Sequence, residues 1–150
     1  VGLKRKLWFI ICNMNDILSK IGSKKSCPVI FLFKEGRVLI GLRNYTPDKW
    51  KSVSVWTTPG GRCDIDETLE QTLRREVKEE VAITEFEITN FVGEVPGSKE
   101  GDVVYVFNGI TQQEPKLMEP AKFGEWRWCA LSEVPVNFIN PKALVLVRGV

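Results

Sequence analysis

The run of residues 69–81 constrains the fold of this chain more than any other segment. Leu69, Leu73, Val77 and Val81 recur at every fourth position. In an α-helix this spacing aligns the four apolar side chains along one face. A helix with a single apolar face is stable only when that face packs on another element, and the flanking segments are rich in β-forming residues. We therefore expect a helix that packs against a sheet.

The segments around this helix predict the strands of a mixed sheet. Lys34-Glu35-Gly36 is a hairpin signal between the first two of them. PKALVLVRGV predicts a closing helix with proline in its first turn, or else a strand. Strands and helices in this order indicate an α/β (α+β) domain. The strand-like segments are PVIFLF, RVLIGLR, VSVWTT, FEITNFVGEV, DVVYVFNGI and EWRWCAL.

The first part of the chain predicts a short extension in front of this domain. Asn13 or Asn15 can cap a short helix there. The apolar run from Leu7 to Cys12 is too short to span a membrane, and no small-residue cleavage site follows it. We expect an extension over residues 1–26, a main domain over residues 27–150 and a cytoplasmic location.

Composition excludes several kinds of catalytic site. The chain has no histidine, which rules out a histidine-bearing zinc site, a histidine triad and a histidine general base. Its four cysteines form no Cys-x-x-Cys pair, and free thiols are the commoner state in such a chain. The formal net charge is only +2. We therefore expect neither a nucleic-acid partner nor a membrane partner.

Three glutamates lie near the apolar face of the expected helix. At roughly 100° per residue, Glu76 and Glu80 fall at the margin of the apolar stripe and Glu79 lies just beyond Glu76. Like charges at i and i+4 repel by roughly 0.2–0.5 kcal/mol, and by more where burial removes their solvation. Either one carboxylate holds a proton or a cation lies among them. An all-oxygen cluster suits Mg²⁺ or Mn²⁺, and a charged surface that tolerates its repulsion is the alternative.

The spacing of these glutamates extends into a longer pattern. Five residues separate Gly61 from Glu67, and seven more separate Glu67 from the pair Arg75-Glu76. The pair Glu79-Glu80 and an aliphatic residue follow. This pattern resembles the Nudix box of the Nudix hydrolases, with Ala82 in place of the usual glycine. The resemblance spans residues 27–150 and implies a Nudix-like α/β/α sandwich with the box helix on the sheet. The matched positions are Gly61, Glu67, Arg75, Glu76, Val77, Glu79, Glu80 and Ile83.

The resemblance implies hydrolysis of a diphosphate linkage, with Mg²⁺ as cofactor and Mn²⁺ as a substitute. The catalytic, metal-binding side chains would be Glu76, Glu79 and Glu80, and the carbonyl of Gly60 would be a further ligand. A carboxylate would accept the proton of the attacking water, because no histidine is available. Glu76 and Glu79 are the candidates for that base within the box. Glu119 and Glu125 are candidates outside it.

Other residues of the pattern would support the site. Gly61, Glu67 and Arg75 would shape the loop and orient the helix, because an arginine-carboxylate pair is a good brace. Asp64 or Asp66 can cap the helix, and helix capping is a second, compatible role for Glu67, three residues after Asp64. At Ala82 a left-handed conformation is convenient, and alanine there would be strained by roughly 1 kcal/mol.

Substrate contacts are predicted at four further positions: Arg43, Glu125, Trp128 and Asn140. Trp126 and Trp128 should share one face of a strand, which meets either the substrate or the core. Markers of the NADH, coenzyme A, ADP-ribose and dinucleoside polyphosphate branches are not evident. We therefore expect a small-molecule nucleotide substrate, a nucleoside triphosphate in normal or oxidised form. The alternative is a Nudix-fold domain that binds a nucleotide without cleaving it. A homodimer is compatible with the sequence.

Overall fold

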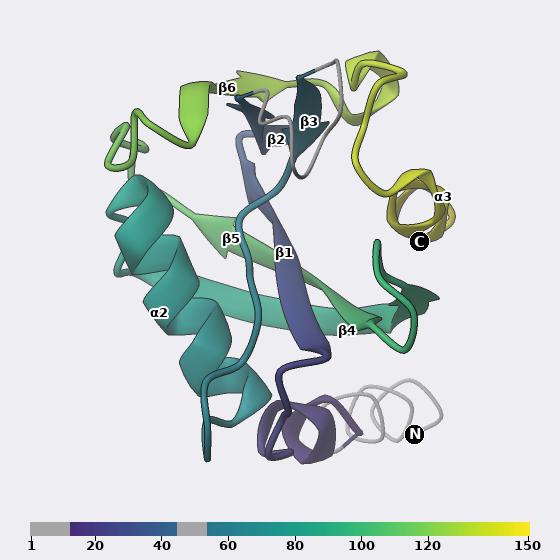
Figure 1. Cartoon of the computed structure of the whole chain (residues 1–150). Coiled ribbons are helices and arrows are strands. Elements are labelled where there is room, and N and C mark those ends of the chain that lie inside the picture. Colours follow the sequence, from purple (N-terminus) through teal and green to yellow (C-terminus); the bar gives the residue numbers. More distant parts are fainter. Residues whose placement is uncertain (1–12, 45–53) are drawn as a thin grey trace, which may run out of the picture.

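The structure is a computed structural model that describes residues 13–44 and 54–150. In this part of the chain a six-stranded mixed sheet carries α2 on one face and α3 on the other (Figure 1), which confirms the expected mixed α+β fold. The strands are β1 (Ser26–Lys34), β2 (Arg37–Arg43), β3 (Val55–Thr57), β4 (Phe86–Pro96), β5 (Val103–Thr111) and β6 (Phe123–Cys129). The helices are α2 (Leu69–Val81), α3 (Pro141–Arg148) and the 3₁₀ turn η1 (Leu131–Glu133). Residues 13–18 are also helical.

The sheet order is β3-β2-β1-β5-β4, and β6 pairs with the other edge of β2. β1 and β5 are parallel, while the other neighbouring strands are antiparallel. The β1–β2 hairpin turns at Glu35 and Gly36, whose φ angles of 51° and 76° fit the twist of a hairpin. β1 and β2 then separate, and the chain after β3 pairs with β1 at Val29↔Gly60. The segment that leads into α2 is thus held against the sheet.

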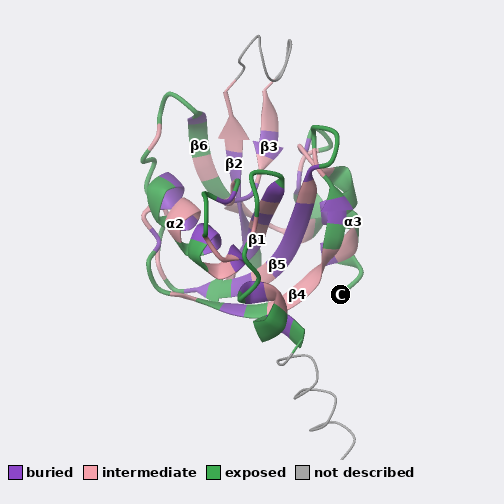
Figure 2. Ribbon diagram, turned by 60° about the horizontal axis from the view of Figure 1, so that its bottom comes forward, coloured by how far each residue is buried: buried purple, intermediate pink, exposed green. Residues whose placement is uncertain are grey.

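Two apolar layers cover the faces of the sheet, and Figure 2 shows that buried residues lie on the strands and on both helices. Along β1, Ile30 and Leu32 belong to the layer under α2, while Phe31 between them belongs to the layer under α3. This alternation is the period-two pattern of a strand buried on both faces. The apolar stripe of α2 is fully buried, as predicted, with 0% exposure at Leu69, Leu73, Val77 and Val81.

The start of α2 differs from the prediction. Thr68 is the N-cap, because its hydroxyl accepts from the amide of Gln71 and the Gln71 side chain accepts from the amide of Thr68. The expectation that Asp64 or Asp66 caps this helix is therefore wrong. Asp66 adopts a φ of 63°, and the turn that contains it places Glu67 before the helix instead of inside it.

The end of α2 has the conformation expected for the signature position. Ala82 is the C-cap, with φ 57° and ψ 26°, and its amide donates to the carbonyl of Lys78. This is the left-handed region that glycine adopts without strain. Alanine therefore occupies a strained position that a glycine would relieve.

The described part of the predicted extension packs against the domain. Met14 and Leu18 are 8% and 5% exposed and belong to the core layer under α2. The amide of Leu69 donates to the carbonyl of Lys20 at 3.0 Å. The apolar run from Leu7 to Cys12 lies outside the described residues, and the boundary at residue 26 stays a prediction. None of the described helices is long and apolar enough to cross a membrane.

Candidate active site

Two glycines let the loop before α2 pass between β1 and the helix. The amide of Ile30 donates to Pro59 O at 2.9 Å, and that of Gly61 to Pro28 O at 3.2 Å. Gly60 has a φ of 152°, and a Cβ there would lie 2.5 Å from Pro28 O. A Cβ on Gly61 would lie 2.5 Å from Cδ of Glu76. Gly60 has no room for a side chain, and a Cβ at Gly61 would displace the Glu76 carboxylate, so the backbone approaches the carboxylates of α2 directly.

Glu80 is the most deeply buried of the three glutamates. It is 4% exposed, and its Oε1 accepts a hydrogen bond of 2.9 Å from the amide of Gly60. Burial raises the pKa of the Glu80 carboxyl to about 8, although the Gly60 hydrogen bond opposes the shift. The negative charges of Glu76 and Glu119 raise it further. This side chain therefore lies where an ionised carboxylate needs a positive partner.

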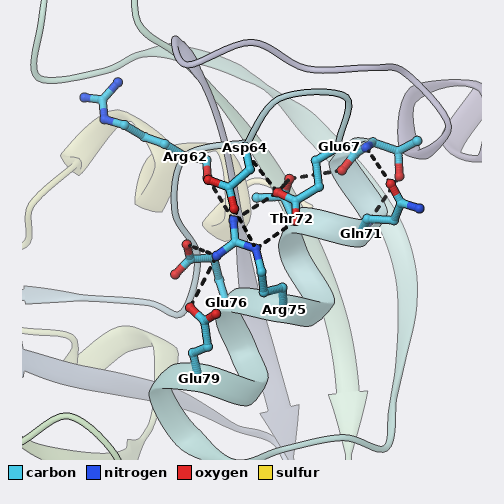
Figure 3. A network of polar contacts seen from close by, with 9 residues as sticks. Arg62, Asp64, Glu67, Gln71, Thr72, Arg75, Glu76 and Glu79 are labelled. Atoms are coloured by element: carbon cyan, nitrogen blue, oxygen red, sulfur yellow. Dashed lines mark hydrogen bonds and ion pairs between the residues drawn. The ribbon is translucent and has the colours of Figure 1, made fainter.

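Glu76 and Glu79 continue the cluster from the core toward solvent. Their side chains are 17% and 52% exposed. Burial raises the pKa of Glu76, and the hydrogen bond from Arg75 opposes this shift. Nη1 of Arg75 donates to Glu76 Oε1 at 2.8 Å and to Glu79 Oε2 at 3.3 Å (Figure 3). One guanidinium thus holds two of the three carboxylates.

The same arginine joins the helix to the preceding loop (Figure 3). Nε and Nη2 of Arg75 donate to the two carboxylate oxygens of Glu67 at 2.7 and 2.9 Å. The hydroxyl of Thr72 and the amide of Asp64 also donate to Glu67 Oε1, at 2.6 and 3.0 Å. The arginine and these further donors lower the pKa of Glu67 to about 2. Since Glu67 precedes the helix, this pair fixes the loop relative to α2.

The oxygen atoms of this region fit a hard divalent cation in their chemistry. Glu76, Glu79 and Glu80 offer carboxylates, and two of them are desolvated enough to have raised pKa values. A cation beside them would favour their ionised forms. Among the described residues no three acidic, cysteine or histidine side chains form a preassembled metal cage. Arg75 pairs with two of the carboxylates instead, so their side chains would have to turn toward an ion.

The loop between β5 and β6 brings two further charges to the cluster. It is anchored by the amide of Lys116, which donates to Val81 O at 2.9 Å, and by Nδ2 of Asn44, which donates to Pro120 O at 3.1 Å. The charge of Glu119 raises the pKa of Glu80, and that of Lys122 lowers the pKa values of Glu76 and Glu80. Glu119 is among the residues predicted from the sequence, whereas Lys122 is not. Its one signal in the sequence is its place three residues after Glu119.

Four residues that were considered for contacts with the substrate or with the attacking water lie on β2 and β6. Cζ of Arg43 lies over the ring of Phe123, 5.5 Å from the ring centroid. Glu125 is exposed on β6. Trp126 and Trp128 both pack against the core layer under α2, which confirms that they share a face. Nε1 of Trp128 donates to Glu114 Oε2 at 2.9 Å.

Asn140 has a different environment. Its Oδ1 accepts from the amide of Ala143 as the N-cap of α3, and its Nδ2 donates to Pro96 O at 3.0 Å. The structure therefore uses both polar atoms of this side chain to hold α3, on the face of the sheet opposite α2. It does not group Asn140 with the glutamates.

The structure thus places two glycines of a loop beside Glu80 and Glu76, on a helix that an arginine braces. The NUDIX domain family model matches residues 24–147. The chain belongs to the Nudix family and is a Nudix-type diphosphate hydrolase.

Known relatives are similar to most of the chain. An oxidized purine nucleoside triphosphate hydrolase of Danio rerio is 29% identical over 122 residues, which are 77% of this chain and 72% of that protein. The crystal structure of a MutT NUDIX hydrolase from Burkholderia pseudomallei has a TM-score of 0.66 at 24% identity, covering 81% of this chain and 96% of the other. A C. elegans Ap4A hydrolase has a TM-score of 0.63 at 22% identity, covering 83% and 92%. The structural likenesses show the fold alone.

Proposed function

We propose that this chain is a Mg²⁺-dependent pyrophosphohydrolase of a nucleoside triphosphate, with oxidised purine nucleotides among its substrates. The observation that carries the proposal is the pair of desolvated carboxylates, Glu76 and Glu80, beside the backbone of Gly60. The activity for which the Danio rerio relative is named supports the substrate class. The products would be a nucleotide and pyrophosphate or phosphate.

Each residue of the site has a proposed task. Mg²⁺, or Mn²⁺ in its place, would be held by Glu76, Glu79, Glu80 and the carbonyl of Gly60. Bound there, the ion would neutralise phosphate charge and make the attacking water more acidic. Arg75 and Glu67, with Gly61, would fix the position of the loop relative to the helix.

A carboxylate would take the proton of the attacking water. Glu76 and Glu79 are the candidates from the helix, and Glu119 is the candidate from outside it because its charge acts on Glu80. Glu125 is an exposed strand residue and the weaker candidate from outside the helix.

Contacts to the substrate are proposed on the β2–β6 side. Arg43 and Trp128 lie there on neighbouring strands. A cytoplasmic location, a homodimer and the absence of nucleic-acid and membrane partners stay predictions.

The test is a substrate panel incubated with the purified chain. It holds oxidised and unmodified purine nucleoside triphosphates, a nucleoside diphosphate sugar and a dinucleoside polyphosphate. Products are separated by chromatography, with Mg²⁺ and then with excess chelator. We expect Mg²⁺-dependent hydrolysis, fastest with a triphosphate. Nucleotide binding by calorimetry without turnover of any substrate would instead identify a binding domain.

A further inference from the structure

A second arginine-carboxylate pair lies directly behind the loop of the candidate site. Nη1 and Nη2 of Arg62 donate to Oδ1 and Oδ2 of Asp102 at 2.8 and 2.6 Å. The Asp102 side chain is only 4% exposed, and that of Arg62 is 41% exposed. The partners are 40 residues apart in the chain. The proposed function uses neither of them.

Asp102 is held rigidly at its own end of the pair. Its Oδ2 accepts from the amide of Lys99 at 3.1 Å, and its carbonyl accepts from the amide of Gly97 at 3.0 Å. These bonds fix the turn between β4 and β5. The hydrogen bond from Arg62 is the largest of the effects that lower the pKa of Asp102 to about 2. Asp102 therefore presents an ionised carboxylate from a fixed turn of the sheet.

Arg62 connects Asp102 to the loop of the candidate site. Gly60 and Gly61 have no side chains, so Arg62 is the first side chain after them that can fix the loop. Its Nη1 also donates to Lys24 O at 3.0 Å. Its own carbonyl accepts from Nη2 of Arg75 at 3.2 Å. The sheet is thus joined through Arg62 to the arginine that pairs with Glu76, and Figure 3 shows how Arg62 and Arg75 lie relative to each other.

We infer that Arg62 and Asp102 are positioning residues that set the backbone of Gly60 and Gly61, and with it the affinity of the site for a divalent cation. The inference rests on the proposed metal site. A bidentate arginine-carboxylate pair fixes both distance and orientation. The two glycines add backbone freedom that some anchor has to remove. A purely structural pair would change the stability of the fold and leave cation affinity unchanged.

The test measures cation affinity directly. Asp102→Asn removes the negative charge of the pair. Arg62→Lys keeps the positive charge but removes the guanidinium, which makes two hydrogen bonds to Asp102. Free and bound Mn²⁺ are distinguished by electron paramagnetic resonance in wild type and both variants, without substrate. Loss of an outer contact of this kind weakens metal binding by roughly 10–100-fold, and we expect that range for Asp102→Asn. In turnover assays the half-saturating Mg²⁺ concentration should rise more than kcat at saturating Mg²⁺ falls.

Two controls separate positioning from stability. Val147→Ala truncates a buried residue of α3 on the opposite face of the sheet, and should lower the melting temperature without changing the Kd for Mn²⁺. Glu70→Gln removes the exposed pair with Arg74 on α2, and should change neither quantity.

Two results would go against the inference or its basis. A wild-type Kd in Asp102→Asn, with a melting temperature lowered as in Val147→Ala, would overturn it. If circular dichroism shows that Asp102→Asn is unfolded, the Kd for Mn²⁺ and the melting temperature of Arg62→Lys are compared with wild type instead, and an unchanged Kd overturns the inference. Failure of the wild-type chain to bind Mn²⁺ would instead overturn the proposed metal site, and the inference with it.

Discussion

At the scale of the residue, Glu79 differs from its two neighbours in the cluster. Its side chain is 52% exposed and hydrogen-bonds to Arg75 at 3.3 Å, whereas Glu80 is 4% exposed and accepts from Gly60. Substitution of Glu79 therefore disturbs the fold least. A substitution at Glu79 therefore distinguishes an effect on catalysis from an effect on stability better than a substitution at Glu76 or Glu80 does.

Glu79→Gln is expected to lower kcat by roughly 10²–10⁴-fold, the usual contribution of a general base. The loss of one exposed charge should leave the melting temperature close to that of wild type. Initial rates with saturating substrate and Mg²⁺ measure the first effect, and circular dichroism melting measures the second. Equal turnover in the variant would remove Glu79 from the mechanism. Glu70→Gln, on the exposed part of the same helix, is the control for the loss of one charge.

Ala82 is strained by its left-handed conformation. Ala82→Gly should raise the free energy of unfolding by about 1 kcal/mol, less the larger backbone entropy of glycine in the unfolded chain. Urea unfolding measures the change. Ala143→Gly is the control, because Ala143 lies inside α3 with helical geometry and the same substitution should destabilise there. A less stable Ala82→Gly variant would show that the conformation at this position is not strained.

At the scale of the element, the pair between Glu67 and Arg75 explains why α2 starts where it does. The spacing of Asp64 and Glu67 predicts a capping box that includes the glutamate. A second box, formed by Thr68 and Gln71, has the same spacing. The choice between them depends on Arg75, which binds both oxygens of Glu67 and so keeps it out of the helix.

This pair makes stability depend on pH. The pKa of Glu67 is about 2 in the folded chain, against an ordinary value of 4.5. A depressed pKa stabilises the fold above the ordinary value, and this contribution is lost as the pH falls from about 4.5 toward 2. Wild type should therefore exceed Glu67→Gln in stability at pH 6, and the difference should shrink through that window. Urea unfolding at a series of pH values measures it, and a constant difference would contradict the assignment.

At the scale of the whole molecule, the sheet separates the candidate site from the second apolar layer. α2 and its glutamates lie on one face, and α3 packs on the other (Figure 1). Damage to the second layer should therefore lower stability without altering the chemistry of the molecules that remain folded.

Val147→Ala tests this separation, because Val147 is 3% exposed in the layer under α3. We expect a loss of about 2 kcal/mol in the free energy of unfolding, from two methyl groups and the cavity they leave. The value of kcat/KM, measured well below the melting temperature, should match wild type. A large fall in kcat/KM would show that the two faces of the sheet are coupled.

The sequence by itself determined the features that depend on regular spacing along the chain. The apolar stripe of α2, the β1–β2 hairpin and the cluster of Glu76, Glu79 and Glu80 follow from the helical and strand periods and from turn chemistry. The left-handed position at Ala82 was expected instead from the resemblance to the Nudix box, which usually has a glycine there.

Tertiary structure decided which distant residues meet. The pair of Arg62 and Asp102, the effect of the Lys122 charge on Glu76 and the hydrogen bond from Asn140 to Pro96 all join segments far apart in the chain. No local period encodes such contacts, because they depend on how the sheet orders its strands and on where its turns end. The candidate site was therefore visible in the sequence as a pattern of carboxylates, while the contacts that hold its loop in place emerged only from the folded chain.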